Sequence, residues 1–197
     1  MRYRILLGAI FLVAIVGNAY GHHVDAKIAI ETRKAVNQWW SPCGTECEWE
    51  WLYAQFIQES SLNPNAVSPV GAEGVGQWLP SSWQEAIRRG WAAKGSSPFQ
   101  LRPAIVASAR YMEYFAGQWR SERPDLDRKA LSRASYNAGL GSLLKAQKAC
   151  DMASLYDDII VCLPEITGRH AQETIGYEIA IRRYYSCLLY TSDAADE

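Results

Sequence analysis

The sequence predicts a mainly α-helical protein that forms one globular domain. Three observations support this prediction. Apolar residues recur with a helical period in several segments, and no segment alternates convincingly enough to be a strand. The chain has 197 residues, too few for two full-sized domains. The only candidate β element is a glycine-rich loop or small irregular hairpin at 68–77, so we expect about seven or eight helices.

Two helices are predicted before this loop. The first covers 24–40 and ends before Pro42 and Gly44, and the second covers 48–60 and ends before the turn at 63–65. After the loop, Pro80 fits the first turn of a helix that runs to 89. The remaining helices are predicted over 103–119, 124–136, 141–149, 153–163 and 169–185.

Charge and composition exclude some functions. The chain has 20 Lys and Arg against 21 Asp and Glu, a net charge of −1, so its overall field does not favour nucleic acid or an anionic membrane. We therefore expect no nucleic-acid partner. Eight Trp and eleven Tyr are unusual, and such rings suit either a dense core or a sugar-binding groove. Composition alone does not choose between these two uses.

The first 21 residues are expected to be a secretory signal peptide. Arg2 and Arg4 precede the apolar run 5–16, which is followed by small residues and is short for a membrane span of about 20 residues. A retained N-terminal anchor is the alternative. We expect an exported protein, periplasmic or extracellular, with its single domain at 22–186.

Residues 187–197 are expected to be foreign to the domain, because they resemble the translation of a sequencing adaptor. Setting Cys187 aside leaves four cysteines, an even number that suggests disulfides in an exported chain. The local pairs are favoured, Cys43 with Cys47 and Cys150 with Cys162. A zinc site formed by all four cysteines is the competing interpretation.

Glu59 is the candidate catalytic acid. Leu52, Phe56 and Glu59 are spaced i, i+4 and i+7, so the carboxylate projects from the apolar stripe of its helix. It also lies near the helix C-terminus, where the macrodipole disfavours negative charge. Both effects favour the protonated acid that a glycosidase needs to protonate a glycosidic oxygen. The alternative is a frayed helix end with Glu59 in water.

Two motifs follow Glu59 along the chain. In the loop 71–78, glycines allow the backbone to approach a ligand closely, and Gln77 offers both a donor and an acceptor. Tyr136 and Asn137 stand at a predicted helix end, just before Gly139. Taken singly, a surface turn and a pair of capping residues explain these motifs equally well.

A further motif lies on the last helix. Glu173 and Tyr177 are spaced i and i+4, so this carboxylate is also expected to point toward the interior. A buried structural hydrogen bond between the two residues is the alternative. Trp78 and Trp83, beside the glycine-rich loop, are candidates for stacking on sugars, whereas Trp39, Trp40, Trp49 and Trp51 are expected to pack in the core.

Taken together and in order, these residues resemble the soluble lytic transglycosylase (SLT-type) domain, a relative of goose-type lysozyme. The matching segments are Glu59-Ser60, Gly74-Val75-Gly76-Gln77, Tyr136-Asn137-Ala138-Gly139, and Glu173-Thr174 with Tyr177. Residues 58–69 are similar to the family pattern almost throughout, and the motifs span 119 of 197 positions. The resemblance implies a lysozyme-like α fold with the glycine-rich loop at its cleft.

The resemblance also implies roles for individual residues. Glu59 matches the sole catalytic acid/base, and Ser60 would orient the substrate's N-acetyl group or the acid itself. Tyr136 would hydrogen-bond near the acid. Many members have Leu-Met where this chain has Val75 and Gly76, so the shape of the groove is expected to differ. The residues expected to bind substrate are Ser60, Gln77, Trp78, Tyr136, Asn137, Glu173 and Tyr177.

By this resemblance, the substrate is the peptidoglycan glycan strand, and no metal or organic cofactor is expected. Glu59 would protonate the oxygen between N-acetylmuramic acid and N-acetylglucosamine, then accept the C6 hydroxyl proton as a 1,6-anhydro end forms. Ordinary glycosidases use two carboxylates. Here Glu73 lies in a loop predicted to be exposed, and the sequence does not place Glu173.

Two other functions stay open. A hydrolytic muramidase would use water in place of the C6 hydroxyl. A non-catalytic peptidoglycan-binding module of an envelope-spanning machine would keep the groove without the chemistry. The sequence does not show whether a secretion, conjugation or phage apparatus is a partner.

Overall fold

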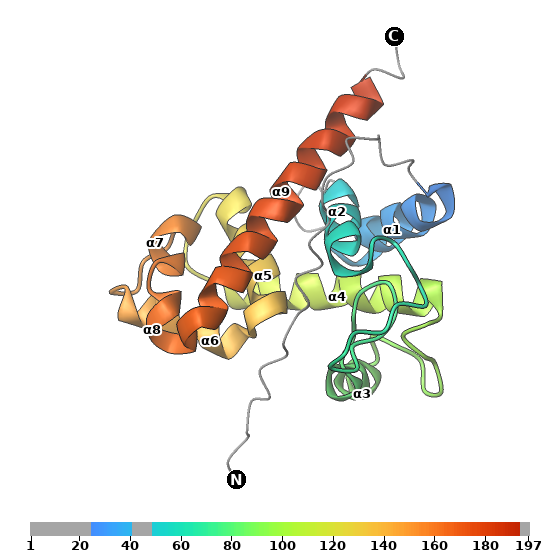
Figure 1. The fold of residues 1–197 in the computed structure, drawn as a ribbon, viewed down its shortest axis with the longest axis horizontal. Helices are drawn as coiled ribbons and strands as arrows, with labels where there is room; N and C mark the ends of the chain where they lie inside the picture. Colours follow the sequence, from blue (N-terminus) through green and yellow to red (C-terminus); the bar gives the residue numbers. More distant parts are fainter. Residues whose placement is uncertain (1–24, 41–48, 194–197) are drawn as a thin grey trace.

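The structure, a computed structural model, describes residues 25–40 and 49–193, and helices make up most of them (Figure 1). No strand forms within these ranges, which confirms the mainly α class. A single 3-10 turn, Gly168–His170, precedes the last helix. The helices are α1 Ala26–Trp39, α2 Trp49–Ser60, α3 Pro80–Arg88, α4 Leu101–Gln118, α5 Asp125–Ala138, α6 Leu140–Ala149, α7 Tyr156–Ile160, α8 Leu163–Thr167 and α9 Ala171–Asp193.

Most predicted helices agree with the observed ones within a few residues, but two predictions were wrong. The helix expected at 153–163 is only the short α7, and α8 was missed. Pro164 explains both errors, because it cannot continue the preceding helix but fits the first turn of a new one. The last helix also extends past 185 to Asp193, and Leu188 is buried in the core.

The glycine-rich loop forms the small irregular hairpin that was one of its two predicted forms. Isolated antiparallel bridges join Val67 to Glu73 and Glu73 to Trp78. Gly74 has a φ of 74°, and a Cβ there would overlap the carbonyl of Pro98. A side chain at Gly74 would therefore push the loop away from residues 97–99.

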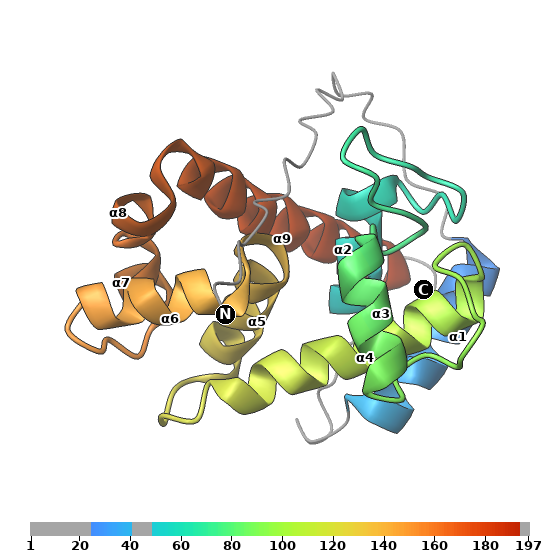
Figure 2. The same ribbon diagram turned by 90° about the horizontal axis from the view of Figure 1, so that it is seen from below.

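The helices form two groups that α9 connects. Figures 1 and 2 show α6, α7 and α8 at one end of the molecule, α1, α2 and α3 at the other, and α9 reaching between them. One core cluster surrounds α2 and includes Leu52, Phe56 and Met112. A second surrounds α5 and α6 and includes Leu131 and Leu143. None of the described helices has both the length and the apolarity that crossing a bilayer requires.

A disulfide joins Cys150 and Cys162 across the short α7, with a Cα to Cα distance of 5.9 Å. This confirms one of the two predicted pairs, and these two cysteines are therefore not zinc ligands. The predicted pair Cys43 and Cys47 lies outside the described residues, as does the predicted signal peptide at 1–21. The domain range 22–186 and the foreign origin of 187–197 stay predictions.

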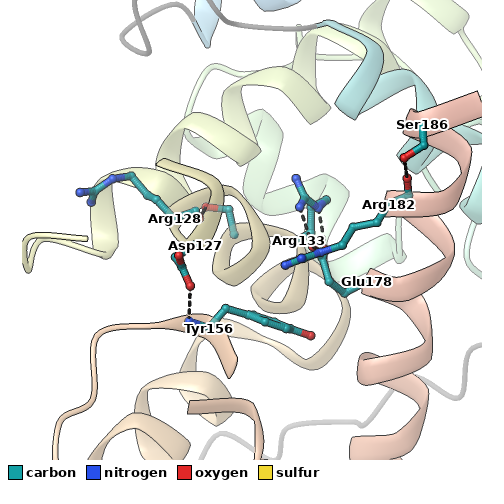
Figure 3. Close-up of polar contacts among 8 residues, drawn as sticks. Asp127, Arg128, Arg133, Tyr156, Glu178, Arg182 and Ser186 are labelled. Atoms are coloured by element: carbon teal, nitrogen blue, oxygen red, sulfur yellow. Dashed lines mark hydrogen bonds and ion pairs between the residues drawn. The ribbon is translucent and has the colours of Figure 1, made fainter. Parts of the chain in front are cut away.

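A buried ion pair joins α5 to α9 (Figure 3). Arg133 Nε and Nη2 each lie 2.6 Å from a Glu178 carboxylate oxygen, and both side chains are 1% exposed. Arg182 also donates to Glu178 at 2.9 Å. The Arg133 guanidinium lies 4.1 Å over the Trp51 ring, which stacks on Tyr185 at 3.7 Å. Thus one cluster fixes α2, α5 and α9 relative to one another.

Removing one partner of this pair is expected to destabilise the protein strongly. Arg133→Met leaves Glu178 buried with only Arg182, and breaking a buried pair costs about 3–5 kcal/mol of unfolding free energy. Arg133→Met with Glu178→Leu should recover much of that loss, because both buried charges are then gone. Urea unfolding measures both variants. Equal losses for the single and the double variant would contradict the prediction.

Candidate active site

Glu59 lies in the last turn of α2, one turn beyond the fully buried Phe56. The side chain is partly exposed, so a ligand can reach it, but the surrounding protein keeps most water from its carboxyl group. Burial raises the pKa of Glu59 to about 8. The predicted position on the apolar stripe, with a carboxyl that favours its protonated form, agrees with this geometry.

Tyr177 is the hydrogen-bond partner of Glu59. It is buried on α9, and its hydroxyl donates to Glu59 Oε1 at 2.5 Å. This bond lowers the pKa of Glu59 and so opposes the larger effect of burial. Burial, together with the charge of Glu59, raises the pKa of Tyr177 well above its usual value. Tyr177 therefore keeps its proton and can stabilise the carboxylate.

Tyr136 approaches the same carboxyl group from α5. Burial raises the pKa of Tyr136 well above its usual value, and the charge of Glu59 is the next largest cause. The hydroxyl donates to the Gly76 carbonyl at 2.5 Å. Tyr136 thus lies near the acid, as expected, but its hydrogen bond goes to the glycine-rich loop.

Ser60 also binds this loop. Its hydroxyl donates to the Val75 carbonyl at 2.9 Å, with a longer contact of 3.3 Å to the Phe56 carbonyl. Because the hydroxyl hydrogen is used in this way, Ser60 holds the loop against the end of α2. The expected direct role in orienting an N-acetyl group or the acid stays a prediction, in which only the oxygen of the hydroxyl is available as an acceptor.

Gln77 ends the loop with a φ of 48°. Its side-chain nitrogen donates to the Gly74 carbonyl at 3.0 Å and lies 3.4 Å from the Ala66 carbonyl. The amide group is thus turned back onto the loop, while the residue stays partly exposed. Gln77 therefore shapes the loop beside the acid, and its donor is used within the loop itself.

The prediction that Trp78 and Trp83 stack on sugars was wrong, because both rings are buried. They are 2% and 4% exposed, and they pack in a third core cluster with Ala86, Ala92 and Ala107. Trp78 Nε1 donates to Ser108 Oγ at 3.2 Å, which satisfies the one polar group of the ring. Both indoles are thus part of the core that underlies the glycine-rich loop.

The other four tryptophans singled out in the sequence lie in or against the first core cluster. Trp40 and Trp51 are buried, and Trp39 and Trp49 pack against the same core, so the core role predicted for these four is confirmed.

Asn137 and Glu173 occupy different environments. Asn137 Oδ1 accepts a bond of 2.7 Å from Thr174 Oγ1, which joins α5 to α9. Glu173 lies partly exposed in the first turn of α9, with Oε2 3.9 Å from His170 Nδ1. The Glu173 side chain is 26% exposed, and its predicted inward direction and role in substrate binding stay predictions. Tyr177, its expected partner, donates to Glu59. The buried carboxylate of α9 is Glu178, which the sequence did not reveal because its i+4 spacing to Arg182 is typical of an exposed ion pair.

Four hydrogen bonds connect these motifs in a closed ring. Ser60 binds Val75, Tyr136 binds Gly76, Thr174 binds Asn137, and Tyr177 binds Glu59. Each motif is therefore bonded to the next, and the last is bonded to the first. Within residues 25–40 and 49–190, no three His, Cys, Asp or Glu side chains are placed to share a metal ion.

Comparison with known proteins agrees with this geometry. The family model described as the transglycosylase SLT domain matches residues 42–156, more than half of the 197. The chain belongs to this family. The SLT domain is 30% identical, over 161 residues, to a membrane-bound lytic murein transglycosylase F of Shewanella halifaxensis. That match covers 74% of this chain but 32% of the relative, so the chain spans about a third of the length of such relatives.

Solved structures show the same fold for the SLT domain. The 70 kDa soluble lytic transglycosylase SLT70 of Escherichia coli matches with a TM-score of 0.61 and 24% identity, over 81% of this chain and 24% of that one. A complex of the 70 kDa soluble lytic transglycosylase with bulgecin A matches over the same shares, with a TM-score of 0.59 and 24% identity. These matches confirm the lysozyme-like architecture.

Tyr177→Phe in the SLT domain is expected to raise the pKa of Glu59 above about 8, because the bond that lowers it is lost. A rise of about one unit corresponds to one hydrogen bond to a charged group. Carbon-13 NMR titration of labelled glutamate carboxyls measures the midpoint, with the Glu59 signal assigned from Glu59→Gln. Tyr53→Phe is the control, because it removes a bond to the Asp25 amide in another part of α2. An unchanged midpoint in Tyr177→Phe would contradict the prediction.

Proposed function

We propose that this SLT domain is a peptidoglycan lytic transglycosylase that cleaves the β-1,4 bond between N-acetylmuramic acid and N-acetylglucosamine. One observation carries the proposal: Glu59 is reachable by a ligand, and burial raises its pKa to about 8. At pH 7 such a carboxyl is protonated in about ten molecules for each ionised one. It can therefore donate a proton at neutral pH, as a general acid must.

In the first step, Glu59 gives its proton to the glycosidic oxygen as the bond to C1 breaks. Tyr177, already bonded to Oε1, stabilises the carboxylate that forms. In the second step this carboxylate takes the proton of the muramoyl C6 hydroxyl, and that oxygen bonds to C1 to give the 1,6-anhydro end. Glu59 is then protonated again, so the cycle needs no water as reactant.

A single carboxylate fits the charges around the acid. Among the described residues, Tyr177 is the titratable group that shifts the pKa of Glu59, and no second carboxylate does so. Ordinary glycosidases use a pair of carboxylates. This supports stabilisation of the positive centre at C1 by the substrate's own acetamido group.

Partly exposed rings next to the acid supply a candidate surface for the glycan strand. Tyr111 lies 5.6 Å from Tyr136 and 5.4 Å from Trp91, measured between ring centroids, and Trp91 lies 5.5 Å from Tyr114. All four residues are partly exposed. Rings of this kind bind the apolar faces of sugars, so this row takes the place of the buried Trp78 and Trp83 in the proposal.

Glu59→Gln is expected to lower the release of anhydromuropeptides from sacculi by about 10²–10⁴-fold. In the wild type, kcat/KM should fall about tenfold per pH unit above about 8, because the protonated acid is lost there. Mass spectrometry of the products and a pH series measure both effects. Glu165→Gln, on the exposed face of α8, is the control.

The same products separate the proposal from its alternatives. A muramidase would release products heavier by one water, and a binding module would release none. Either result with folded wild-type protein would contradict the transglycosylase assignment, and full activity in Glu59→Gln would contradict the role of the acid.

Trp91→Ala is expected to raise KM for soluble glycan strands about tenfold with little change in kcat, because one stacking contact is lost. Trp39→Ala is a matched control. Both indoles are partly exposed with an arginine over the ring, Arg89 at 5.0 Å and Arg110 at 4.2 Å, but Trp39 is outside the row. Steady-state kinetics measures both variants. Equal changes in KM would contradict a binding role for Trp91.

The proposed substrate also bears on location. Peptidoglycan lies outside the cytoplasmic membrane, so the proposal includes export of the domain. The predicted signal peptide is consistent with this, and the relative in Shewanella halifaxensis is named as membrane-bound.

A further inference from the structure

Four buried side-chain polar atoms have no hydrogen-bond partner among the described residues. They are Gln55 Nε2, Gln55 Oε1, Arg133 Nη1 and Asn137 Nδ2. Three are nitrogen donors and one is an oxygen acceptor. They come from α2 and α5, which each pack against α9.

The register of α2 places Gln55 on the side that faces α5 and α9. Trp51, Gln55 and Glu59 are spaced by four residues, so they lie one above another on the helix. Trp51 contacts Arg133 and Tyr185, and Glu59 contacts Tyr177. Gln55 lies between them on the same stripe and is 1% exposed.

On α5 and α9, which face this stripe of α2, polar side chains are also spaced one helical turn apart. Arg133 and Asn137 are one turn apart on α5, and they bond to Glu178 and Thr174, which are one turn apart on α9. Figure 3 shows the Arg133 guanidinium directed at Glu178, and this pairing uses Nε and Nη2 but leaves Nη1 without a partner. Tyr177 precedes Glu178 and is buried with it. Arg133 acts electrostatically on Tyr177, and Gln55 lies one turn along α2 from Glu59, the hydrogen-bond partner of Tyr177, so both unpaired side chains lie near Tyr177.

Such groups are costly in a dry core. A buried donor or acceptor without a partner destabilises a protein by about 1–3 kcal/mol. Native proteins satisfy nearly all such groups, and internal water with two to four polar partners is the usual means. Gln55, one turn from Trp51, and Arg133, whose guanidinium lies over the Trp51 ring, bring two donors and one acceptor to the same region, which meets that requirement.

We propose that Gln55, Arg133 and Asn137 bind internal water behind Tyr177, and that Gln55 is thereby a positioning residue for Glu59. Water molecules there accept from these donors, and one of them donates to the Tyr177 oxygen, which polarises the Tyr177 hydroxyl toward Glu59 Oε1. The chain stabilises the carboxylate after proton transfer. This inference rests on the proposed function only for its catalytic consequence, not for the water site itself.

Charged and titratable side chains from three helices face the site. Tyr136 and Arg133 face it from α5, and Tyr177 and Glu178 from α9, with Arg182 bound to Glu178 at the edge. On α4, Tyr111 lies behind Tyr136, and burial raises its pKa to about 12. Glu59 is thus the group whose titration reports on the water site.

Carbon-13 NMR titration of Glu59 tests the proposal in the wild type, Gln55→Met and Gln147→Met. Gln55→Met removes the amide but keeps the size, so the midpoint should rise by about half a pH unit. Gln147 is a second buried glutamine, but its nitrogen is bonded to the Ala153 carbonyl at 2.8 Å, on α6. Gln147→Met should therefore lower stability and leave the Glu59 midpoint unchanged.

A second measurement needs no variant. A high-resolution crystal structure of the wild type should show ordered water within hydrogen-bonding distance of Gln55 Nε2 and Arg133 Nη1. An unmoved midpoint in folded Gln55→Met, or a crystal structure with protein atoms alone around these groups, would overturn the proposal. Neither readout uses enzymatic activity, so the proposed function can fail without affecting this test.

Discussion

The hydrogen bond between Tyr177 and Glu59 is the constraint on which the site depends. It joins two helices whose bonded residues are 118 positions apart, so it exists only if α9 holds its place along α2. Two other contacts secure that placement. The Trp51 ring stacks on Tyr185 two turns further along α9, and the buried pair of Arg133 and Glu178 fixes α9 to α5. A shift of α9 by one turn would separate Tyr177 from the acid.

The same site opposes stability. Burial raises the pKa of Glu59 to about 8, above the value of about 4.3 expected in an unfolded chain. For a group whose pKa is raised on folding, the favourable contribution is complete below the unfolded pKa and is lost as pH rises through the folded one. Above pH 8 the fold must hold an enclosed carboxylate, and the Tyr177 bond offsets part of that cost. The cost of this neutral acid therefore builds up between about pH 4.3 and 8, where the unfolded chain has lost the proton that the folded protein keeps, and it is complete above pH 8.

Local patterns predicted much of the fold and the position of the acid. Apolar periodicity indicated most of the helices, and the i, i+4, i+7 spacing to Leu52 and Phe56 placed Glu59 on the buried side of α2. The failures concern contacts between distant segments. Because Trp78 follows a glycine-rich loop, the sequence suggested that its ring is available to a ligand. In the structure the ring is buried and bonded to Ser108, a contact 30 residues away that the sequence does not reveal. Similarly, Glu178 and Arg182 have the spacing of a surface pair, and the burial of Glu178 depends on Arg133, 45 residues away.

The ring of hydrogen bonds explains why a departure from the family pattern can occur in the glycine-rich loop. Ser60 and Tyr136 bind the carbonyl oxygens of Val75 and Gly76, so the ring uses the backbone of the loop and not its side chains. A different side chain at position 75 can therefore leave the bond from Ser60 intact. At position 76 a Cβ would lie 2.8 Å from Ser108 Oγ and 3.0 Å from Trp78 Nε1, so these side chains would have to shift to admit any residue but glycine. The glycine at 76 and the burial of Trp78 are thus structurally linked, because Trp78 occupies the space that a side chain at 76 would enter.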